Sequence, residues 1–392
     1  MQLNHSLQLA YCTNVHRGES WLETYLALQK FVPAIRQRVC PNKPFAIGLR
    51  LSNRAANELS DPTTMLDFRR WMGKNSCYVF TINGFPYGQF HGIRVKENVY
   101  SPDWSTPERV AYTNLLFNLL AEMMPTGVEG SVSTLPCTFK EYYPTGETLK
   151  AIRQNIWKTV EHISRVSCKT GRKLHLGLEP EPLCWLESTA ETLHFFDHLR
   201  AEHPKDERLA EHLGVNYDTC HFAVEFEEAQ TALACMANYG IKISKIHLSS
   251  ALKVTPTANV RAKLETFIDN VYLHQVVARD ATGDRTIFSD LPEALARART
   301  LYGEDEAELP EWRIHFHVPL HAPAESPLNN TNDHLLETLN LLGQYPALCS
   351  HLEMETYTWE VLPPELKSQD VVDQIVGEYE WTLERLRERG LA

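Results

Sequence analysis

Short β-rich runs alternate along the chain with longer stretches in which apolar residues recur at helical spacing. Nine runs have the length and composition of strands: Leu9–Val15, Phe45–Leu51, Cys77–Asn83, Gly130–Leu135, Leu174–Glu179, Leu213–Asp218, Ile243–Leu248, Trp312–Val318 and His351–Tyr357. The segments with helical spacing include Trp21–Gln37, Glu108–Met124, Thr148–Lys169, Leu193–Arg200, Glu225–Tyr239, Leu291–Tyr302 and Asp333–Leu342. Because parallel neighbours need a helical crossover, this alternation predicts a parallel sheet.

The number of repeats favours a closed (β/α)8 barrel, a TIM barrel, over an open dinucleotide-binding sheet. No Gly-x-Gly-x-x-Gly follows the first strand, as the open sheet would require. Nine candidates are one too many for a barrel. We expect an insertion at about residues 253–327, which would place the His-rich strand Trp312–Val318 outside the barrel; the alternative is that this strand belongs to the barrel and another does not. We find no linker-like segment and expect one elaborated barrel domain over residues 1–392.

Composition narrows the classes of partner. The 392 residues carry 38 basic and 50 acidic side chains, a formal net charge of −12, which disfavours nucleic acid or an anionic membrane surface as a partner. Apolar runs such as Leu115–Leu120 are far too short to span a bilayer. The nine cysteines form no Cys-x-x-Cys pair, and the first ten residues lack the features of a secretory signal. These features predict a cytoplasmic protein with reduced thiols.

Alternation along the strands predicts which side chains face the barrel interior. In four strands the apolar residues share one face, which should contact the helices, so the polar residues share the inward face. The inward positions at the carboxyl ends are then Glu179 and Glu181, Asn216 and Asp218, His247 and Ser249, and Glu353 and Glu355. Active sites of such barrels lie at this end, so these side chains should line one mouth.

The clustering of acidic side chains at this mouth predicts a metal site. Glu179, Asp218, His247 and Glu355 end four separate strands at comparable heights, and their carboxylates would repel one another unless a divalent cation neutralised them. Oxygen and nitrogen ligands of this kind suit Mn²⁺, Mg²⁺, Zn²⁺, Co²⁺ or Fe²⁺. Glu353 has the same parity as Glu355 and is an alternative ligand. The other interpretation is a set of solvated carboxylates and one hydrogen-bonded histidine.

The same residues carry a family resemblance. Leu178-Glu179-Pro180, Asp218-Thr219-Cys220-His221, Lys245-Ile246-His247 and a late glutamate resemble the xylose-isomerase-like barrel superfamily of sugar isomerases, epimerases and endonuclease IV-type enzymes. This resemblance implies metal ligation by Glu179, Asp218, His247 and Glu355. It also places His221 near the substrate or a second metal.

A narrower resemblance rests on four further stretches. Tyr11–His16 with Gly18–Trp21, Leu176–Pro182, Lys245–Leu252 and Glu353–Trp359 are similar to the EboE family of metabolite-traffic proteins. Arg17 departs from that pattern, since a proline is expected after His16. The resemblance implies a role in handling or moving precursors of secondary metabolites, with pathway proteins as possible partners.

Further polar residues are candidates for binding a substrate. Asn14 and His16 share a face at the end of the first strand, and Asn83 ends the third. Arg50 points inward on the second strand, where it could hold a carboxylate or phosphate or form a salt bridge with a neighbouring strand.

The His-rich strand and the aromatic residues near strand ends extend this candidate set. His315 and His317, with His321 beyond them, could bind metal, contact substrate or shuttle protons; on an inserted strand they could also be a solvated polar face. Aromatic side chains such as Trp359 could wall an apolar pocket.

Three functions fit these observations. The first is a metal-dependent isomerase or epimerase acting on a small metabolite, with Glu179 and Glu355 flanking the reacting carbon and His221 also placed among the catalytic residues. The second is a non-catalytic protein that binds or transfers a metabolite. The third, endonuclease IV-like phosphodiester hydrolysis, is disfavoured by the acidic charge.

Overall fold

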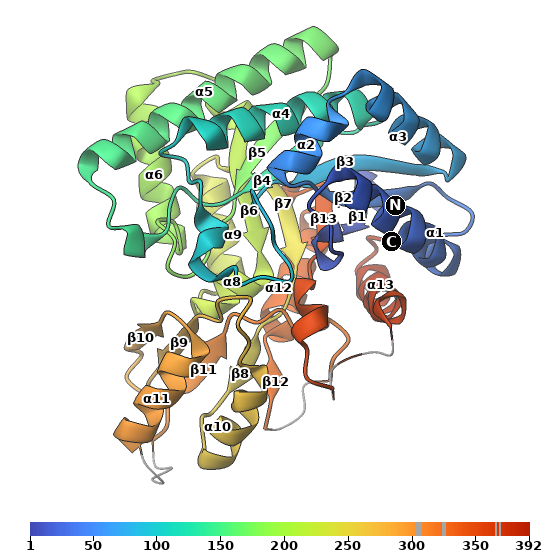
Figure 1. The fold of residues 1–392 in the computed structure, drawn as a ribbon. Helices are drawn as coiled ribbons and strands as arrows, with labels where there is room; N and C mark the ends of the chain where they lie inside the picture. The colour runs from blue at the N-terminus through green and yellow to red at the C-terminus, as the bar shows by residue number, and fades with distance from the viewer. Residues whose placement is uncertain (303–307, 324–326, 365–366, 368–369) are drawn as a thin grey trace.

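Eight parallel strands form the main sheet of the protein, which a computed structural model describes at residues 1–302, 308–323, 327–364, 367 and 370–392. The strands lie in the order β1-β13-β7-β6-β5-β4-β3-β2, and a parallel bridge between Cys12 and Gly48 joins the two ends of the sheet. The strands are β1 (Gln8–Tyr11), β2 (Phe45–Arg50), β3 (Cys77–Asn83), β4 (Gly130–Thr134), β5 (Leu174–Leu178), β6 (Leu213–Asp218), β7 (Lys242–Leu248) and β13 (His351–Met354). The predicted barrel is therefore confirmed (Figure 1).

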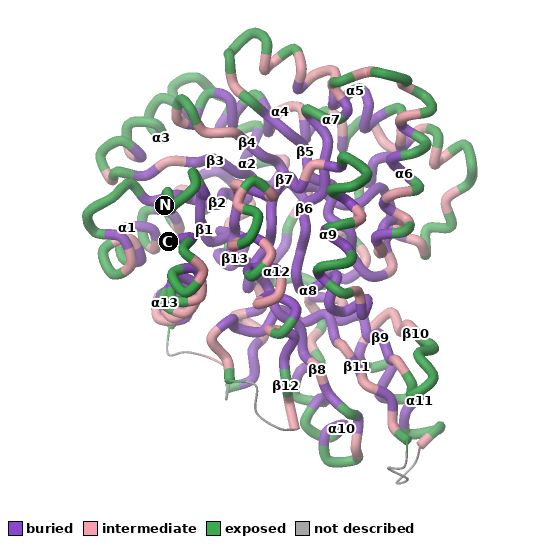
Figure 2. Tube along the Cα trace, turned by 180° about the vertical axis from the view of Figure 1, so that it is seen from behind, coloured by how far each residue is buried: buried purple, intermediate pink, exposed green. Residues whose placement is uncertain are grey.

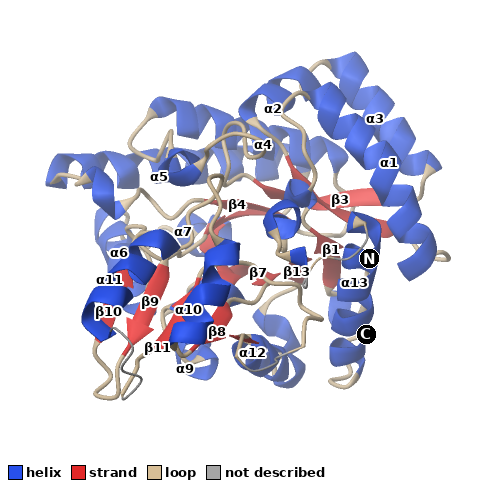
Figure 3. Ribbon diagram, turned by 60° about the horizontal axis from the view of Figure 1, so that its bottom comes forward, coloured by secondary structure: helices blue, strands red, loops and turns tan. Residues whose placement is uncertain are grey.

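Helices surround this sheet on its outer side (Figure 3). The longer ones are α1 (Trp21–Val39), α3 (Pro62–Lys74), α4 (Pro107–Met123), α5 (Gly146–Thr170), α6 (Thr189–Glu202), α9 (Ala229–Asn238), α12 (Asn332–Gln344) and α13 (Val371–Arg387). Shorter ones are α2 (Asn53–Leu59), α7 (Arg208–His212) and α8 (Thr219–Val224). Local sequence sets several starts: Ser20 and Glu23 form a reciprocal cap on α1, and Asp61 caps α3.

The ninth candidate strand lies in a second, antiparallel sheet. This sheet has the order β10-β9-β11-β8-β12 and packs with its own helices α10 (Ala258–Leu264) and α11 (Leu291–Tyr302) in the lower part of Figure 1. Its strands are β8 (Leu252–Val254), β9 (Val276–Arg279), β10 (Arg285–Phe288), β11 (Glu311–Ile314) and β12 (Asn329–Asn330). An insertion near the C-terminal strands is thus present, although residues 303–307 and 324–326 of the expected range lie outside the described part.

The two sheets have separate apolar cores. Leu176, Val215, Ile246 and Leu352 belong to the barrel core, as their parity predicts, and a second cluster packs around Trp312. Buried residues follow the strands, and exposed ones follow the outer faces of the helices (Figure 2). In the described part of the chain, no helix has both the length and the apolar character needed to cross a membrane.

Candidate metal centre and cavity

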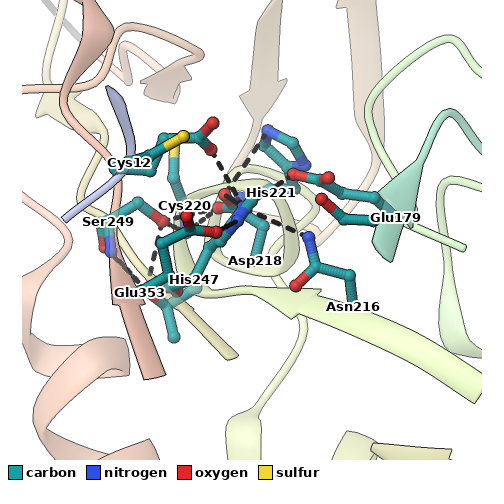
Figure 4. Close-up of polar contacts among 12 residues, drawn as sticks. Cys12, Glu179, Asn216, Asp218, Cys220, His221, His247, Ser249 and Glu353 are labelled. Carbon is teal, nitrogen blue, oxygen red and sulfur yellow. Dashed lines mark hydrogen bonds and ion pairs between the residues drawn. The ribbon is translucent and has the colours of Figure 1, made fainter. Parts of the chain in front are cut away.

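Four strand ends bring the predicted metal-ligating residues together. Glu179, Asp218, His247 and Glu355 each offer a ligand atom, and these atoms all lie within 4.8 Å of one another. The Nδ1 atom of His247 is central: it lies 2.9 Å from Glu179 Oε1, 3.0 Å from Glu355 Oε2 and 3.4 Å from Asp218 Oδ2. Figure 4 shows Glu179, Asp218 and His221 around His247. All four predicted ligands are at most 5% exposed.

Sheet register explains why these side chains meet. Asp218 on β6 is the direct partner of His247 on β7, and β5 and β13 flank that pair. A bulge between Val215 and Asn216 shifts the register of β6 against β7 just before this point. Residues opposite one another on adjacent strands point to the same face of the sheet. The inward-facing side chains of neighbouring strands therefore lie next to one another inside the barrel.

The structure separates the two glutamates that the sequence leaves equivalent. Glu355 faces His247 Nδ1, together with Glu179 and Asp218. Glu353 lies on the other side of the ring, where its Oε2 is 2.8 Å from His247 Nε2. A carboxylate at this place accepts the Nε2–H proton, which would leave Nδ1 to a bound metal. Glu353 is thus placed to position the His247 ring, and Glu355 offers a candidate ligand atom.

A buried lysine compensates the charge of Glu353. The Lys245 ammonium contacts Glu353 Oε2 and donates a 3.0 Å hydrogen bond to Ser133 Oγ, and both charged side chains are fully buried. Burial would raise the pKa of Glu353, but Lys245 and His247 outweigh it and lower that pKa to about 2. Burial would likewise lower the pKa of His247, yet Glu355 and Glu179 hold it well above its ordinary value. The carboxylates around His247 therefore stabilise a positive charge at this place.

Hydrogen bonds to one oxygen of each carboxylate hold the side chains of Glu355 and Asp218 in place. Glu355 Oε1 accepts from Asn14 Nδ2 at 2.6 Å and Asn83 Nδ2 at 2.8 Å. Asp218 Oδ1 accepts from the backbone amides of Cys220 and His221, because Asp218 is the N-cap of α8. The opposite oxygen, Asp218 Oδ2, is buried and has no hydrogen-bond partner within the described residues.

Buried carboxylate oxygens that lack a hydrogen-bond partner indicate whether this group of residues fits a cation. Glu179 Oε2 resembles Asp218 Oδ2 in being buried without a hydrogen-bond partner among the residues that the structure describes. Buried polar atoms are normally satisfied, so two buried carboxylate oxygens without a partner in this group of ligands fit a bound ion. Three carboxylates and one imidazole suit Mn²⁺, Mg²⁺, Zn²⁺, Co²⁺ or Fe²⁺.

A cavity opens above this centre. It contains about 540 Å³ of space free of protein atoms, part of it open to solvent. Its polar side includes Asn14, Asn83, Glu179, Glu181, His221, His315 and Glu355. Its apolar side includes Phe85, Phe90, Val99, Tyr100, Tyr272, Leu273 and Tyr357. Burial, with Glu179 and Asp218 nearby, keeps the pKa of the Glu181 carboxyl well above its usual range, although Tyr100 donates a hydrogen bond to it.

The remaining predicted substrate-binding residues lie elsewhere. His16 stacks on Phe31 with ring centroids 4.2 Å apart. Arg50 donates to the backbone oxygens of Gly18 and Gly88 and lines a different hollow. Trp359 lies under Lys367, also outside the central cavity. His317 does not line the cavity but contacts His315 behind it. His321 is separate from both histidines and lies against Gly377.

Several residues of the site carried no usable signal in the sequence. Tyr272 lines the cavity, and Gln275 donates a hydrogen bond to Tyr100 Oη of the cavity wall. Both come from the loop before β9, far along the chain from the barrel strands. Tyr100 ends the 3-10 helix η3 (Lys96–Tyr100) between β3 and α4. Lys245 is the exception, because it shares the inward parity of His247 two residues later.

Comparison with known proteins supports the fold. No family model matches the sequence, and no curated protein matches it. Among solved structures, a xylose isomerase-like TIM barrel protein from Mycobacterium smegmatis in complex with magnesium superimposes with a TM-score of 0.55 at 12% identity, over 99% of both chains. L-ribulose 3-epimerase gives a TM-score of 0.50 at 12% identity, over 99% of this chain and 96% of its own. The fold is that of a xylose-isomerase-like TIM barrel.

Proposed function

We propose that this chain is a metal-dependent isomerase or epimerase that acts on a small hydroxylated metabolite. The observation that carries the proposal is the convergence of Glu179, Asp218, Glu355 and His247 Nδ1 at the floor of a half-apolar cavity. Solved barrels of the same fold include an epimerase and a magnesium complex, which supports this choice over an unrelated activity.

A divalent cation bound here would polarise a substrate carbonyl or hydroxyl and so acidify the neighbouring C–H bond. The chain itself supplies the proton carriers. Glu179 has an unpartnered oxygen within the described surroundings, and Glu355 is held in one orientation by Asn14 and Asn83. Two carboxylates from different strands can take a proton from one side of a carbon and return it from another. Glu181 and His221 line the same cavity and can bind substrate oxygens or pass protons.

The cavity also indicates the kind of substrate. Its carboxylate side suits an oxygen-rich end, while Phe85, Phe90, Tyr272 and Tyr357 suit an apolar or ring-shaped portion. We therefore infer a metabolite less polar than a simple sugar. The EboE-like stretches suggest that it is a precursor of a secondary metabolite, and partner proteins of that pathway would follow from the same role.

We also propose that barrel and insertion act as one unit. Tyr272, Leu273 and His315 come from the inserted region and line the cavity together with Glu179 and Glu355 of the barrel. A chain that lacked the insertion would lose one wall of the cavity.

Deuterium incorporation tests the activity without knowledge of the product. The full chain is incubated with Mn²⁺ in D₂O and a panel of ketoses, cyclitols and aryl-substituted hydroxyketones, and carbon-bound deuterium is measured by mass spectrometry. We expect exchange that falls at least about 100-fold in Glu179→Gln. The matched control, Glu122→Gln, replaces an exposed glutamate of α4 and should behave as wild type.

Binding measured by calorimetry separates the two main candidates. A ligand that binds in a metal-dependent way without any exchange would refute the enzyme and support a metabolite carrier. Metal content that does not change in Glu179→Ala/Glu355→Ala would refute the carboxylate centre itself.

A further inference from the structure

A buried carboxylate in the cavity wall has no strong cationic partner. Glu181 is 6% exposed and lines the cavity beside Glu179. Within the described residues, neither lysine nor arginine forms an ion pair with it, and the contact that it does make, with Nδ1 of His315, is 3.6 Å long. Buried acidic side chains are normally paired, because it costs free energy to remove a charge from water.

The Nδ1 proton of His315 is directed to an amide rather than to this carboxylate. His315 Nδ1 lies 2.8 Å from Gln275 Oε1. Gln275 Nε2 lies 3.3 Å from the Pro182 carbonyl oxygen, which can only accept, so the amide is oriented with Oε1 towards His315. Burial also lowers the pKa of His315 well below its ordinary value, so the ring is neutral. His315 therefore does not neutralise Glu181.

Tyr100 holds the carboxylate through a hydrogen bond whose direction follows from its neighbours. Gln275 Nε2 donates to Tyr100 Oη at 2.8 Å, so the phenol proton is free to donate to Glu181 Oε1, also at 2.8 Å. The ring of Tyr100 stacks on Phe139 with centroids 4.5 Å apart, which fixes its position. Glu181 is thus held in the cavity wall as a hydrogen-bond acceptor.

The lysine of the cavity wall is bound elsewhere. Lys96 is 7% exposed, and its Nζ lies 2.7 Å from Asp290 Oδ2 and 3.1 Å from the Asp269 carbonyl oxygen. Glu179 and Glu355, which also line the cavity, add negative charge. The described cavity wall therefore offers no free lysine or arginine to a phosphate or carboxylate group of a ligand.

Aromatic rings form the rest of the wall. Phe90, Tyr272 and Tyr357 pack together with ring centroids 5.2–5.3 Å apart, and all three line the cavity. The faces of such rings attract organic cations, most strongly where water is excluded. A buried carboxylate and several aromatic rings in one cavity suit a ligand that carries an ammonium group, whereas a neutral polyol would leave the carboxylate without a positive partner.

We propose that the cavity binds a substrate with a protonated amine, such as an amino-substituted cyclic polyol or ketose. The ammonium group contacts Glu181, and the aromatic residues enclose the carbon skeleton. The inference rests on the proposed function, because the hydroxylated end of the substrate would lie at the candidate metal centre. The formal net charge of −12 also favours the approach of a cationic substrate.

Calorimetry with small probes tests this charge requirement without turnover. The full chain, loaded with Mn²⁺, is titrated at pH 7 with benzylamine, which is protonated, and with benzyl alcohol, a neutral molecule of the same shape. We expect benzylamine to bind at least about 10-fold more tightly. Benzyltrimethylammonium, which has a permanent charge and no lone pair, should also bind more tightly than benzyl alcohol. Binding of benzylamine alone would indicate coordination to the metal and would overturn the inference.

A single substitution assigns the preference to Glu181. Glu181→Gln keeps the shape and a hydrogen-bond acceptor but removes the charge, so the affinity for benzylamine should fall at least about 10-fold, to that for benzyl alcohol. The matched control, Glu122→Gln on the exposed face of α4, should leave the preference unchanged. A preference that persists in Glu181→Gln overturns the inference. So do equal affinities of wild type for the two probes, or no binding of either ammonium compound, and these two results need no variant.

The outcomes separate this inference from the proposed reaction. Absence of deuterium exchange, with the preference for benzylamine retained, refutes the isomerase or epimerase and leaves the ammonium site in place. Exchange into neutral hydroxyketones without any preference for benzylamine supports the reaction and overturns the ammonium site.

Discussion

The buried pair of Lys245 and Glu353 permits a quantitative test of the electrostatics below the metal centre. Both side chains are 0% exposed, and Lys245→Met removes one charge while it keeps most of the apolar stem. Glu353 would then remain buried with His247 as its nearest positive partner. Removal of one member of a buried pair typically costs about 3–5 kcal/mol.

The shift in acidity gives an independent figure of the same size. The pKa of Glu353 falls from 4.5 to about 2, which corresponds to roughly 3 kcal/mol of preferential stabilisation of the charged form. A loss of this size is a large part of the total stability of an ordinary domain. We therefore expect Lys245→Met to lower the free energy of unfolding by about 3–5 kcal/mol.

Urea unfolding at pH 7, followed by circular dichroism with a chelator present, measures this loss without a metal contribution. The matched control is Arg54→Met, which breaks an exposed pair with Glu58 and should leave the free energy of unfolding close to that of wild type. The double variant Lys245→Met/Glu353→Gln should recover part of the loss, because no unpaired charge remains. A Lys245→Met protein within about 1 kcal/mol of wild type would refute the reasoning.

Three further predictions concern the same region. Gly48→Ala should destabilise the chain by about 1–3 kcal/mol and weaken metal binding, because a Cβ at this position would overlap Glu353 Oε1 and lie 2.7 Å from the Tyr11 carbonyl oxygen. The control is Gly73→Ala in α3, where a Cβ would have no atom within 4 Å. Equal unfolding midpoints of the two variants would contradict the prediction. The pKa of Glu353 is about 2 in the folded chain, so the stability that its charged form contributes is complete above about pH 4.5 and is lost as the pH falls towards 2. The free energy of unfolding of Glu353→Gln should therefore depend less on pH in this window than that of wild type. Parallel curves for the two proteins would count against the Lys245–Glu353 pair. Arg109→Met should lower the free energy of unfolding by about 1–3 kcal/mol, because the buried Arg109 donates to the carbonyl oxygens of Pro102, Gly84 and Phe85. Urea unfolding measures this loss, and an unchanged free energy would contradict the prediction.

The predicted cytoplasmic location and the absence of nucleic acid as a partner remain expectations of the sequence. The domain limits likewise stay a prediction, although the expected insertion coincides with most of the second sheet.

The barrel and the composition of its carboxylate centre could be predicted from the sequence alone. Alternation is a local property of a strand, so the inward parity of Glu179, Asp218 and His247 could be inferred from each strand separately. The first strand shows the limit of this reasoning: it ends at Tyr11, and Thr13–Val15 form a 3-10 helix, yet Asn14 still reaches Glu355.

The choice between Glu353 and Glu355 needed the folded chain, since both have the same parity and differ in which side of the His247 ring they reach. Folding also brings His315, which follows β11 of the second sheet, to His221 of α8, a contact between residues 94 positions apart in sequence. Such contacts depend on which strands adjoin and on how an insertion folds back over the barrel. Those are non-local properties, which periodicity within single elements does not encode.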